Sequence, residues 1–415
     1  MPGNYAKVTW VMQESLRSLL NRLEVATYFN TDLSKEYKKG FAVGDTIYPK
    51  LPQRFTIRDG MSYTPQAIDR KTTTVTMDQF FGVDFDYDSV EKMLEMERGE
   101  ELVKSEYIDK AVEQLAQELD QRCANFAMMN CPNQVGNHGA TPATINPYSD
   151  ARARLVSLAC GGDKNGMIIS PSMHATLGQN LTLLLNPQKE ISDLFRTGLM
   201  GNAFGFNWHE SMSIYDFQAG TMTVADCTVT TTVTTQGATS LGITSNAAAV
   251  ALKKGDVITF TTPLAVNPAT RRSIGVAKSV VLTQDTTIAA GGGTGTVYFY
   301  PPLYGPGSPY QNIDQLPQAG HVLLLSPGTT TATGAHGVIG LAINRDAFAL
   351  VSVPLEEPKA VEISKTVRDP RTGISISLVR QFEGRTRTYI NRLDILCGFG
   401  RLYAENCCVR VASLL

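Results

Sequence analysis

The residue types that carry out acid–base chemistry gather on one stretch of this chain. Carboxylates recur along a predicted helix at Glu106, Asp109, Glu113, Glu118 and Asp120. A pair such as Glu113 and Glu118 could in principle serve as general acid and general base, so an enzyme with an unrecognised carboxylate site stays open as an alternative. Charge repeated along one helix face is more typical of a solvated or subunit-facing surface. We therefore expect these carboxylates to be structural.

No other motif for catalysis or cofactor binding is present. The five histidines, at positions 138, 174, 209, 321 and 336, lie outside the HExxH and HxH patterns of metal sites. Gly291–Gly295 lacks the lysine and the following helix of a phosphate-binding loop, and is more typical of a hairpin tip. The glycines at 198, 201 and 205 follow a predicted helix, whereas a dinucleotide fingerprint follows a strand. We predict no catalytic residue, no metal and no cofactor.

Composition narrows the class of protein. The chain has 415 residues, 43% of them hydrophobic and 18% charged, as in folded globular proteins. A formal net charge of −2 supplies no basic surplus for wrapping nucleic acid or binding a membrane surface. The sequence contains no run of 18 apolar residues, so we expect no membrane-spanning helix. The N-terminal stretch contains Glu14, unlike the apolar region of a secretory signal. The seven cysteines are scattered without CxxC spacing, so we expect reduced thiols and folding in the cytosol.

The N-terminal region predicts an amphipathic helix over residues 5–24. Its apolar residues recur at spacings of three and four: Val8, Met12, Leu16, Leu19 and Leu23. A helix of this length cannot bury such a stripe by itself. The stripe must pack on the body of its own chain or on a neighbouring chain, and Met12 and Leu16 are candidate contact residues for a neighbour.

Residues 44–88 predict a long extended β-loop. Short strand-like runs at either end enclose a polar span around Arg58-Asp59-Gly60. An isolated two-stranded ribbon is marginally stable in water, so we expect this ribbon to lie on another chain. The candidate contact residues within it are Arg54, Arg58, Asp59, Arg70 and Lys71.

The rest of the chain predicts a mixed α+β protein. Helical spacing predicts a long helix over about 108–126 and a shorter one over 148–160. Strands are predicted at 166–170, at 206–210 and within 338–353. Two further strands, at 374–382 and 388–396, should pair across the polar connection 383–387.

Between Thr221 and Tyr300 the composition changes, because 19 of 80 residues are threonine and only eight are charged. Short Thr/Val strands separated by Gly and Asn favour a small barrel or sandwich. Such a block inside a mixed chain indicates an inserted domain. Its Thr/Gly composition alone would also suit a β-rich adhesin or tail-fibre protein, but that alternative leaves the helix near 108–126 unexplained.

Three stretches, in this order, carry a resemblance to a known family. They are DLFRTGLMGNAFGFNWHES at 193–211, LKKGDVITF at 252–260, and RDPRTGISISLVRQF at 368–382 continuing to RLDIL at 392–396. With the element order, they make the whole chain resemble the major capsid proteins of tailed double-stranded DNA phages. The similarity is to the short-tailed phage coat family, whose Hong Kong 97-type capsid fold carries an inserted β-domain.

This resemblance implies a domain organisation. It places an N-terminal arm at 1–43, an extended β-loop at 44–76, and a peripheral domain with the spine helix at 77–135 and 360–405. An axial domain would comprise 136–217 and 318–359, an inserted β-barrel 218–317, and a C-terminal end 406–415. Arg271 and Arg272, the paired charges of the block besides the Lys253-Lys254 turn, are candidates for contacts between capsomers.

The resemblance also implies function and partners. It describes a non-enzymatic shell protein of the virion capsid that is assembled in the host cytoplasm, from pentamers and hexamers, around a scaffolding protein. The shell would expand as DNA is packaged. A portal, non-specifically contacted double-stranded DNA and a decoration protein are further implied partners, and no membrane is. An encapsulin-like compartment shell, which has the same fold and encloses enzymes, is the nearest alternative, and the inserted domain argues against it.

Overall fold

The computed structural model describes residues 2–33, 44–57, 60–61, 65–66, 71–88, 107–136, 142, 144–160, 165–181, 201–214, 216–222, 227–246, 248–325, 336–359 and 361–412. These residues divide into two compact units. Unit 1 contains 1–51, 72–123 and 348–402, and unit 2 contains 52–71, 124–347 and 403–415. Of the sequence patterns above, the segments 89–106 and 182–200 lie outside the described residues.

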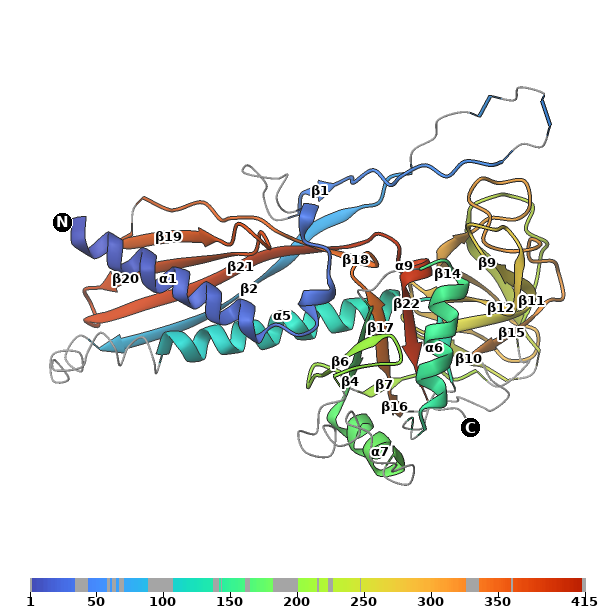
Figure 1. Ribbon diagram of the computed structural model, residues 1–415, viewed down its shortest axis with the longest axis horizontal. Helices are drawn as coiled ribbons and strands as arrows, with labels where there is room; N and C mark the ends of the chain where they lie inside the picture. Colours follow the sequence, from blue (N-terminus) through green and yellow to red (C-terminus); the bar gives the residue numbers. More distant parts are fainter. Residues whose placement is uncertain are drawn as a thin grey trace. The chain divides into compact units, whose positions relative to one another are not determined.

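Unit 1 is built on an antiparallel sheet with two long strands at its centre (Figure 1). The strand order is β1-β2-β21-β20-β19, and β18 also pairs with β21. The strands are β1 (Thr46–Ile47), β2 (Val75–Asp88), β18 (Phe348–Ser352), β19 (Ile363–Arg368), β20 (Ser375–Glu383) and β21 (Thr388–Arg401). The β20–β21 pair closes at Glu383 and Thr388, so the predicted hairpin across 383–387 is confirmed.

Close backbone approach in this sheet depends on glycine. A Cβ at Gly398 of β21 would lie 2.3 Å from the carbonyl oxygen of Thr76 in β2. The register of the two strands shifts between Thr76 and Gln79, which is an irregularity of the β-bulge kind. Only a residue without a side chain fits where the strands approach this closely.

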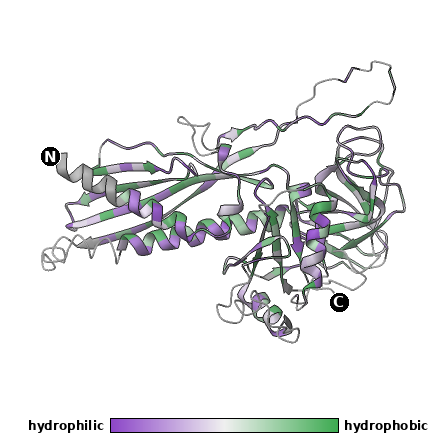
Figure 2. Cartoon of the chain, in the orientation of Figure 1, coloured by the Kyte–Doolittle hydropathy of each residue, from purple (hydrophilic) through white to green (hydrophobic). Residues whose placement is uncertain are grey.

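Two helices belong to this unit in part or whole. Helix α1 (Pro2–Arg22) contacts β19 and β20, and a 3₁₀ turn, η1 (Ala26–Tyr28), follows it. Helix α5 (Asp109–Asn130) carries the predicted apolar stripe, with Val112, Leu115 and Leu119 buried, while its exposed positions hold hydrophilic residues (Figure 2). The sequence boundary between the units falls within α5, at Cys123.

The body of unit 2 is a second, mixed sheet. Its order is β3-β22-β17-β4-β6-β5. The strands are β3 (Gln134–Val135), β4 (Asn165–Ile169), β5 (Asn202–Ala203), β6 (Phe206–Glu210), β17 (Gly340–Asn344) and β22 (Cys408–Val411), with helices α6 (Asn146–Ser157), α7 (Pro171–Leu181) and α9 (Ala404–Cys407) around it. A separate pair joins β7 (Asp216–Gln218) to β16 (His336–Val338). Strands β4 and β17 are buried at every residue, as strands covered on both faces are.

The Thr-rich block, extended to Leu303 and joined by the strand at 322–325, forms a closed barrel within unit 2. The strands follow the order β11-β12-β14-β9-β8-β15. They are β8 (Cys227–Val229), β9 (Ala238–Ser245), β11 (Val257–Val266), β12 (Ser273–Leu282), β14 (Thr294–Leu303) and β15 (Val322–Leu325), and a small pair joins β10 (Val250–Leu252) to β13 (Thr286–Ile288). Its core includes Phe260, Leu282, Val297, Phe299 and Leu323. Threonine suits this architecture because its branched side chain fits the half-buried surface of a strand.

Candidate functional site

Three of the four most exposed large apolar side chains among the described residues belong to the extended segment of unit 2, and the fourth is Met212, which is 90% exposed. Phe55 is 63% exposed, Ile57 96% and Met61 101%. In unit 1, Tyr48 of the same extended stretch of sequence is 62% exposed. Scattered apolar residues are normal on a protein surface, but a run of nearly uncovered large ones marks an interaction site.

Contacts to the barrel and within the segment hold it in place. The Arg271 guanidinium donates from Nη2 to the carbonyl oxygens of Phe55, at 3.2 Å, and Pro309, at 3.3 Å. The Lys71 ammonium lies 3.6 Å and 3.8 Å from the ring centroids of Tyr304 and Tyr310. Such cation–π contacts contribute about 0.5–1 kcal/mol at exposed positions. The backbone of the segment is thus anchored while its apolar side chains stay uncovered.

Gln66 provides a further brace across the segment. Its side-chain oxygen accepts from the Thr56 amide at 2.8 Å, and its side-chain nitrogen donates to the Thr56 carbonyl at 2.6 Å. One amide side chain therefore satisfies both backbone groups of Thr56, as a paired strand would. Because the Thr56 backbone is fixed by these two hydrogen bonds, the position of the following residue, Ile57, is restricted as well.

The predicted contact residues occupy different environments. Arg271 and Lys71 have the intrachain partners just described, Arg272 is exposed, and Arg54 lines a cavity of about 460 Å³. Met12 and Leu16 are 0% and 4% exposed, so the described part of the α1 stripe that they form is covered within the chain. The structure thereby favours the intrachain alternative for this stripe. Three candidates lie outside the described residues: Arg58, Asp59 and Arg70.

The carboxylates of α5 do not converge on a shared site. Glu113 pairs with Arg22 at 2.7 Å and Lys110 at 3.1 Å, and the hydrogen bond from Lys110 is the main cause that lowers the pKa of Glu113. Glu118 accepts from Arg122 at 2.7 Å. Glu113 and Glu118 therefore each pair with a basic side chain of the same chain, and the two carboxylates do not form the acid–base pair considered above.

Asp120 corrects the expectation that all these carboxylates occupy an exposed or subunit-facing surface. It is only 4% exposed, and its oxygens accept the backbone amides of Glu24 at 2.7 Å and Ala26 at 3.0 Å. Burial raises the pKa of Asp120 to about 6, against the opposing effect of these hydrogen bonds. Asp120 therefore fixes the turn that follows α1, and its role is structural.

Metal and membrane candidates remain without support in the part of the chain that the structure describes. Within those residues, no group of three or more His, Cys, Asp or Glu side chains is placed to hold a metal ion. The His174 side chain forms a 2.9 Å contact with Glu210. No described helix combines the length and apolarity needed to cross a membrane.

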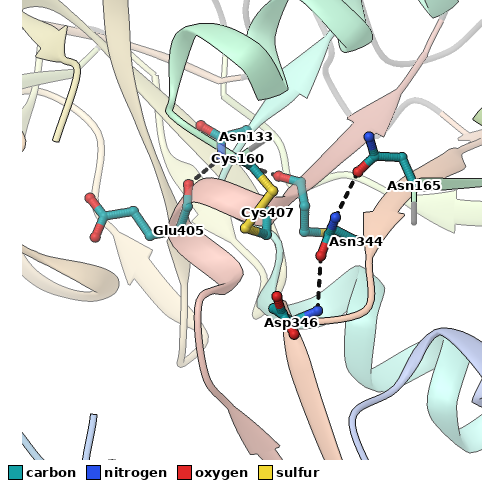
Figure 3. Close-up of a disulfide and its surroundings, with 8 residues drawn as sticks. Asn133, Cys160, Asn165, Asn344, Asp346, Glu405 and Cys407 are labelled. Atoms are coloured by element: carbon teal, nitrogen blue, oxygen red, sulfur yellow. Dashed lines mark hydrogen bonds between the residues drawn. A yellow bond between two sulfur atoms is a disulfide. The ribbon is translucent and has the colours of Figure 1, made fainter. Parts of the chain in front are cut away.

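One cysteine expectation is wrong. Cys160, after α6, and Cys407, at the end of α9, form a disulfide with their Cα atoms 5.2 Å apart (Figure 3). The two residues are 247 positions apart in the chain, so spacing gave no signal for the pair. Beside it, the Asn133 side chain donates to the Glu405 carbonyl at 2.6 Å and the Cys408 carbonyl at 3.1 Å. These contacts tie the C-terminal element to the body.

Arg410 is a second residue whose environment the sequence did not reveal. It is 1% exposed and donates to the carbonyl oxygen of Gly255 at 2.7 Å and to that of Met128. Its guanidinium also lies 5.6 Å from the Phe217 ring centroid. One buried side chain of β22 thus joins the barrel's Lys253–Asp256 turn to the end of α5.

Comparison with known proteins identifies what such a chain resembles. The model of the family described as "P22 coat protein – gene protein 5" matches residues 84–409. The match spans both units and includes the whole barrel. No curated protein matches the chain.

Solved phage structures are similar at low identity. A chain of Mycobacterium phage Che8 is 12% identical with a TM-score of 0.47, covering 94% of this chain and 90% of its own. The capsid of cyanophage P-SCSP1u gives 12% identity, a TM-score of 0.43 and coverages of 91% and 85%. The acid-stable capsid of Helicobacter pylori bacteriophage KHP30 gives 8% identity and a TM-score of 0.37, with 91% of this chain and 87% of that chain covered.

Proposed function

Because this chain belongs to the P22 coat protein family and is a structural major capsid protein of a bacteriophage, we propose that its extended segment joins neighbouring subunits. Many copies of the chain assemble into the icosahedral virion capsid. Assembly of this kind uses repeated heterologous contacts that close into rings and then a shell. Each subunit must therefore present a surface that only a neighbour covers.

The observation that carries the proposal is the exposure of Phe55, Ile57 and Met61. Covering a large apolar side chain contributes about 1.5–3 kcal/mol. Arg271 and Lys71 support the role indirectly, since they anchor the segment's backbone and so reduce the entropy lost on docking. Met12 and Leu16 are left out of this surface, because they are buried within the chain. Arg272, which is exposed, remains a candidate contact between capsomers.

The finer fold assignment is also a proposal. The mixed α+β architecture fits a capsid fold of the Hong Kong 97 type, with α5 as spine helix, the unit 1 sheet as peripheral domain and the unit 2 sheet as axial domain. The closed barrel would then be the inserted domain of the family. Its buried apolar core supports an independently packed module.

The remaining steps follow the family's mode of assembly. Subunits would assemble in the host cytoplasm around a scaffolding protein, with a portal at one vertex, and the shell would expand as double-stranded DNA enters. DNA would be contacted non-specifically, because a net charge of −2 leaves no basic surplus to hold it. The proposal includes a decoration protein as a further partner.

Electron microscopy of the purified, overexpressed chain tests the proposal. Closed shells or tubes are expected for the intact chain, and soluble unassembled subunits for a variant lacking residues 54–72. Normal shells from the deleted variant would refute the role of the segment. Small discrete oligomers of the intact chain, with scaffolding protein present, would refute the assembly model itself. A cargo enzyme inside shells made in the native host would favour the encapsulin-like alternative.

A further inference from the structure

A buried lysine lies where the barrel meets the body of unit 2. Lys278 of β12 is 4% exposed, and it is the only lysine among the buried residues of the described structure. Lysine is almost never buried this far unless a partner takes up its charge. The Lys278 ammonium donates to Oε1 of Glu405 in α9 at 2.8 Å, and the Glu405 side chain is 22% exposed. A buried amine therefore faces a carboxylate that keeps some contact with solvent.

A buried amide shares this carboxylate oxygen. Asn312, in the segment between β14 and β15, is 4% exposed, and its Nδ2 donates to the same Oε1 of Glu405 at 2.7 Å. Nδ2 also donates to the Pro302 carbonyl at 2.8 Å, and Oδ1 accepts from the Tyr304 amide at 2.8 Å. These partners assign which end of the side chain is oxygen and which is nitrogen. Both polar atoms of the amide are thus held in place.

The amine, the amide and the carboxylate match the requirements for joining an amine to an amide. A lysine amine is a nucleophile once it has lost a proton, and a carboxylate within hydrogen-bond distance can take that proton. The same carboxylate oxygen contacts the nitrogen that would leave, so it can return a proton there. The Tyr304 N–H is placed to stabilise negative charge that forms on Oδ1. Because folding holds these groups together, the reaction would be intramolecular.

We propose that Lys278 and Asn312 condense into an isopeptide bond within the subunit, with Glu405 as the proton-transfer residue. A proton of the Lys278 ammonium passes to Glu405, and the free amine forms a bond from Nζ to Cγ of Asn312. The carbonyl electron pair moves to Oδ1. Glu405 then gives its proton to Nδ2 and takes one from Nζ. The Cγ–Nδ2 bond breaks as the carbonyl re-forms, and ammonia leaves with the proton of Glu405 as an ammonium ion.

The reaction consumes no other reactant and regenerates the Glu405 carboxylate. Its product joins β12 covalently to the segment that follows β14. It also replaces the buried ammonium of Lys278 by a neutral amide, which removes a charge from the interior. Since Glu405 belongs to α9, the bond can form only after the barrel has docked on the body of unit 2. The cross-link would therefore make a completed folding step permanent.

The mass of the intact, folded chain tests this bond. The purified, unassembled chain is incubated for a long period, then denatured and its disulfide reduced. Its mass should be lower than the sequence mass by one molecule of ammonia. Tryptic digestion should give one branched peptide, in which Lys278 is uncleaved and joined to the peptide that contains Asn312. A succinimide at an asparagine also loses ammonia, but it leaves every peptide unbranched.

Two variants assign the reaction to its residues. Glu405→Gln keeps the shape of the side chain but removes the proton acceptor, so this variant should keep its full sequence mass. Lys278→Arg keeps a cation beside Glu405, but a guanidinium stays protonated and cannot attack the amide. It should also keep its full sequence mass. Lys253→Arg is the matched control, because Lys253 donates to the amide oxygen of Gln218 at 2.8 Å outside this cluster, and it should lose ammonia as the parent chain does.

A parent chain that stays at its full sequence mass after long incubation would overturn the proposal, and the cluster would then be a hydrogen-bonded ion pair only. That result is decisive whether or not the variants fold. A branched peptide in Glu405→Gln would overturn the role given to Glu405, and a branch at another lysine would overturn the assignment to Lys278. None of these outcomes depends on shell assembly, so the proposed function is tested separately.

Discussion

Replacing Ile57 by serine tests whether a neighbour covers the extended segment. Ile57 is 96% exposed in the subunit, so Ile57→Ser should change the stability of the subunit by less than about 0.5 kcal/mol. If a neighbouring chain covers this side chain, the same change removes about 1.5–3 kcal/mol from each contact. Since each 1.36 kcal/mol is a factor of ten, the free subunit concentration in equilibrium with shells should rise about 10- to 150-fold.

Sedimentation of assembled shells measures that concentration directly. Subunits at a series of total concentrations are brought to equilibrium, the shells are pelleted, and the protein left in the supernatant is quantified. Ile57→Val is the matched control, because it loses one methylene, worth about 0.8 kcal/mol, and should shift the value about fourfold. Thermal unfolding of all three subunits should coincide.

Two results would refute the reasoning. If Ile57→Ser assembles at the wild-type concentration, no neighbour covers this side chain. If Ile57→Ser lowers the Tm of the unassembled subunit instead, the side chain is packed within its own chain and the exposure argument fails.

Three further changes test structural roles inside the subunit. Gly398→Ala places a Cβ 2.3 Å from the Thr76 carbonyl oxygen and should lower the free energy of unfolding, measured with denaturant, by about 3 kcal/mol. Gly384→Ala is the control, because the space around Gly384 is open, and it should be near neutral. Equal effects of the two substitutions would contradict the close-approach argument. Because the pKa of Asp120 in the folded chain is about 6 and its ordinary value is 3.8, its contribution to stability is present below about pH 4 and is lost as pH rises through 6. The wild-type advantage over Asp120→Asn should thus shrink by about 2.4 kcal/mol between pH 4 and 7, and a pH-independent difference would refute this. Cys160→Ser removes the disulfide to Cys407, which is 247 positions away, and should lower the free energy of unfolding by up to about 5 kcal/mol in the chain-entropy description. A reductant should destabilise the wild type and leave Cys160→Ser unchanged. An equal response of both proteins to reductant would contradict the disulfide.

Periodic patterns in the sequence predicted the regular elements well. The strand expected at 206–210 is β6, and the hairpin expected across 383–387 joins β20 and β21. The helix expected near 108–126 corresponds to α5, and the Val112, Leu115 and Leu119 side chains of its apolar stripe are buried. These elements are predictable because burial of one face imposes a period of two or 3.6 residues, which is local information. The assignment of domain boundaries to the family's scheme stays a prediction.

The polar interior could not be predicted in the same way. Asp120 belongs to the same series as the half-buried carboxylates of its helix, and only the arrival of Glu24 and Ala26, more than 90 positions away, makes it a buried acceptor. Cys160 and Cys407 likewise meet through tertiary structure. Of the contact residues, Met12 and Leu16 had two possible partners, and helical spacing cannot tell which one covers a stripe. A one-dimensional pattern gives the face of an element but never its partner.

Directional polar contacts are concentrated where the barrel meets the body of unit 2. Lys278 of the barrel donates to Glu405 of α9 at 2.8 Å, the Asn312 side chain donates to the same carboxylate at 2.7 Å, and Arg410 reaches the Gly255 carbonyl. Buried ion pairs add little net stability, because desolvation offsets their attraction, yet removing one partner costs about 3–5 kcal/mol. An apolar junction could slide between similar packings, whereas these bonds are satisfied in one orientation only. The sparse charges of the Thr-rich block therefore act mainly where the barrel meets the body of unit 2, because Lys278 and the Lys253–Asp256 turn fix the orientation of the barrel there. The remaining strands carry little charge because they pack around an apolar core.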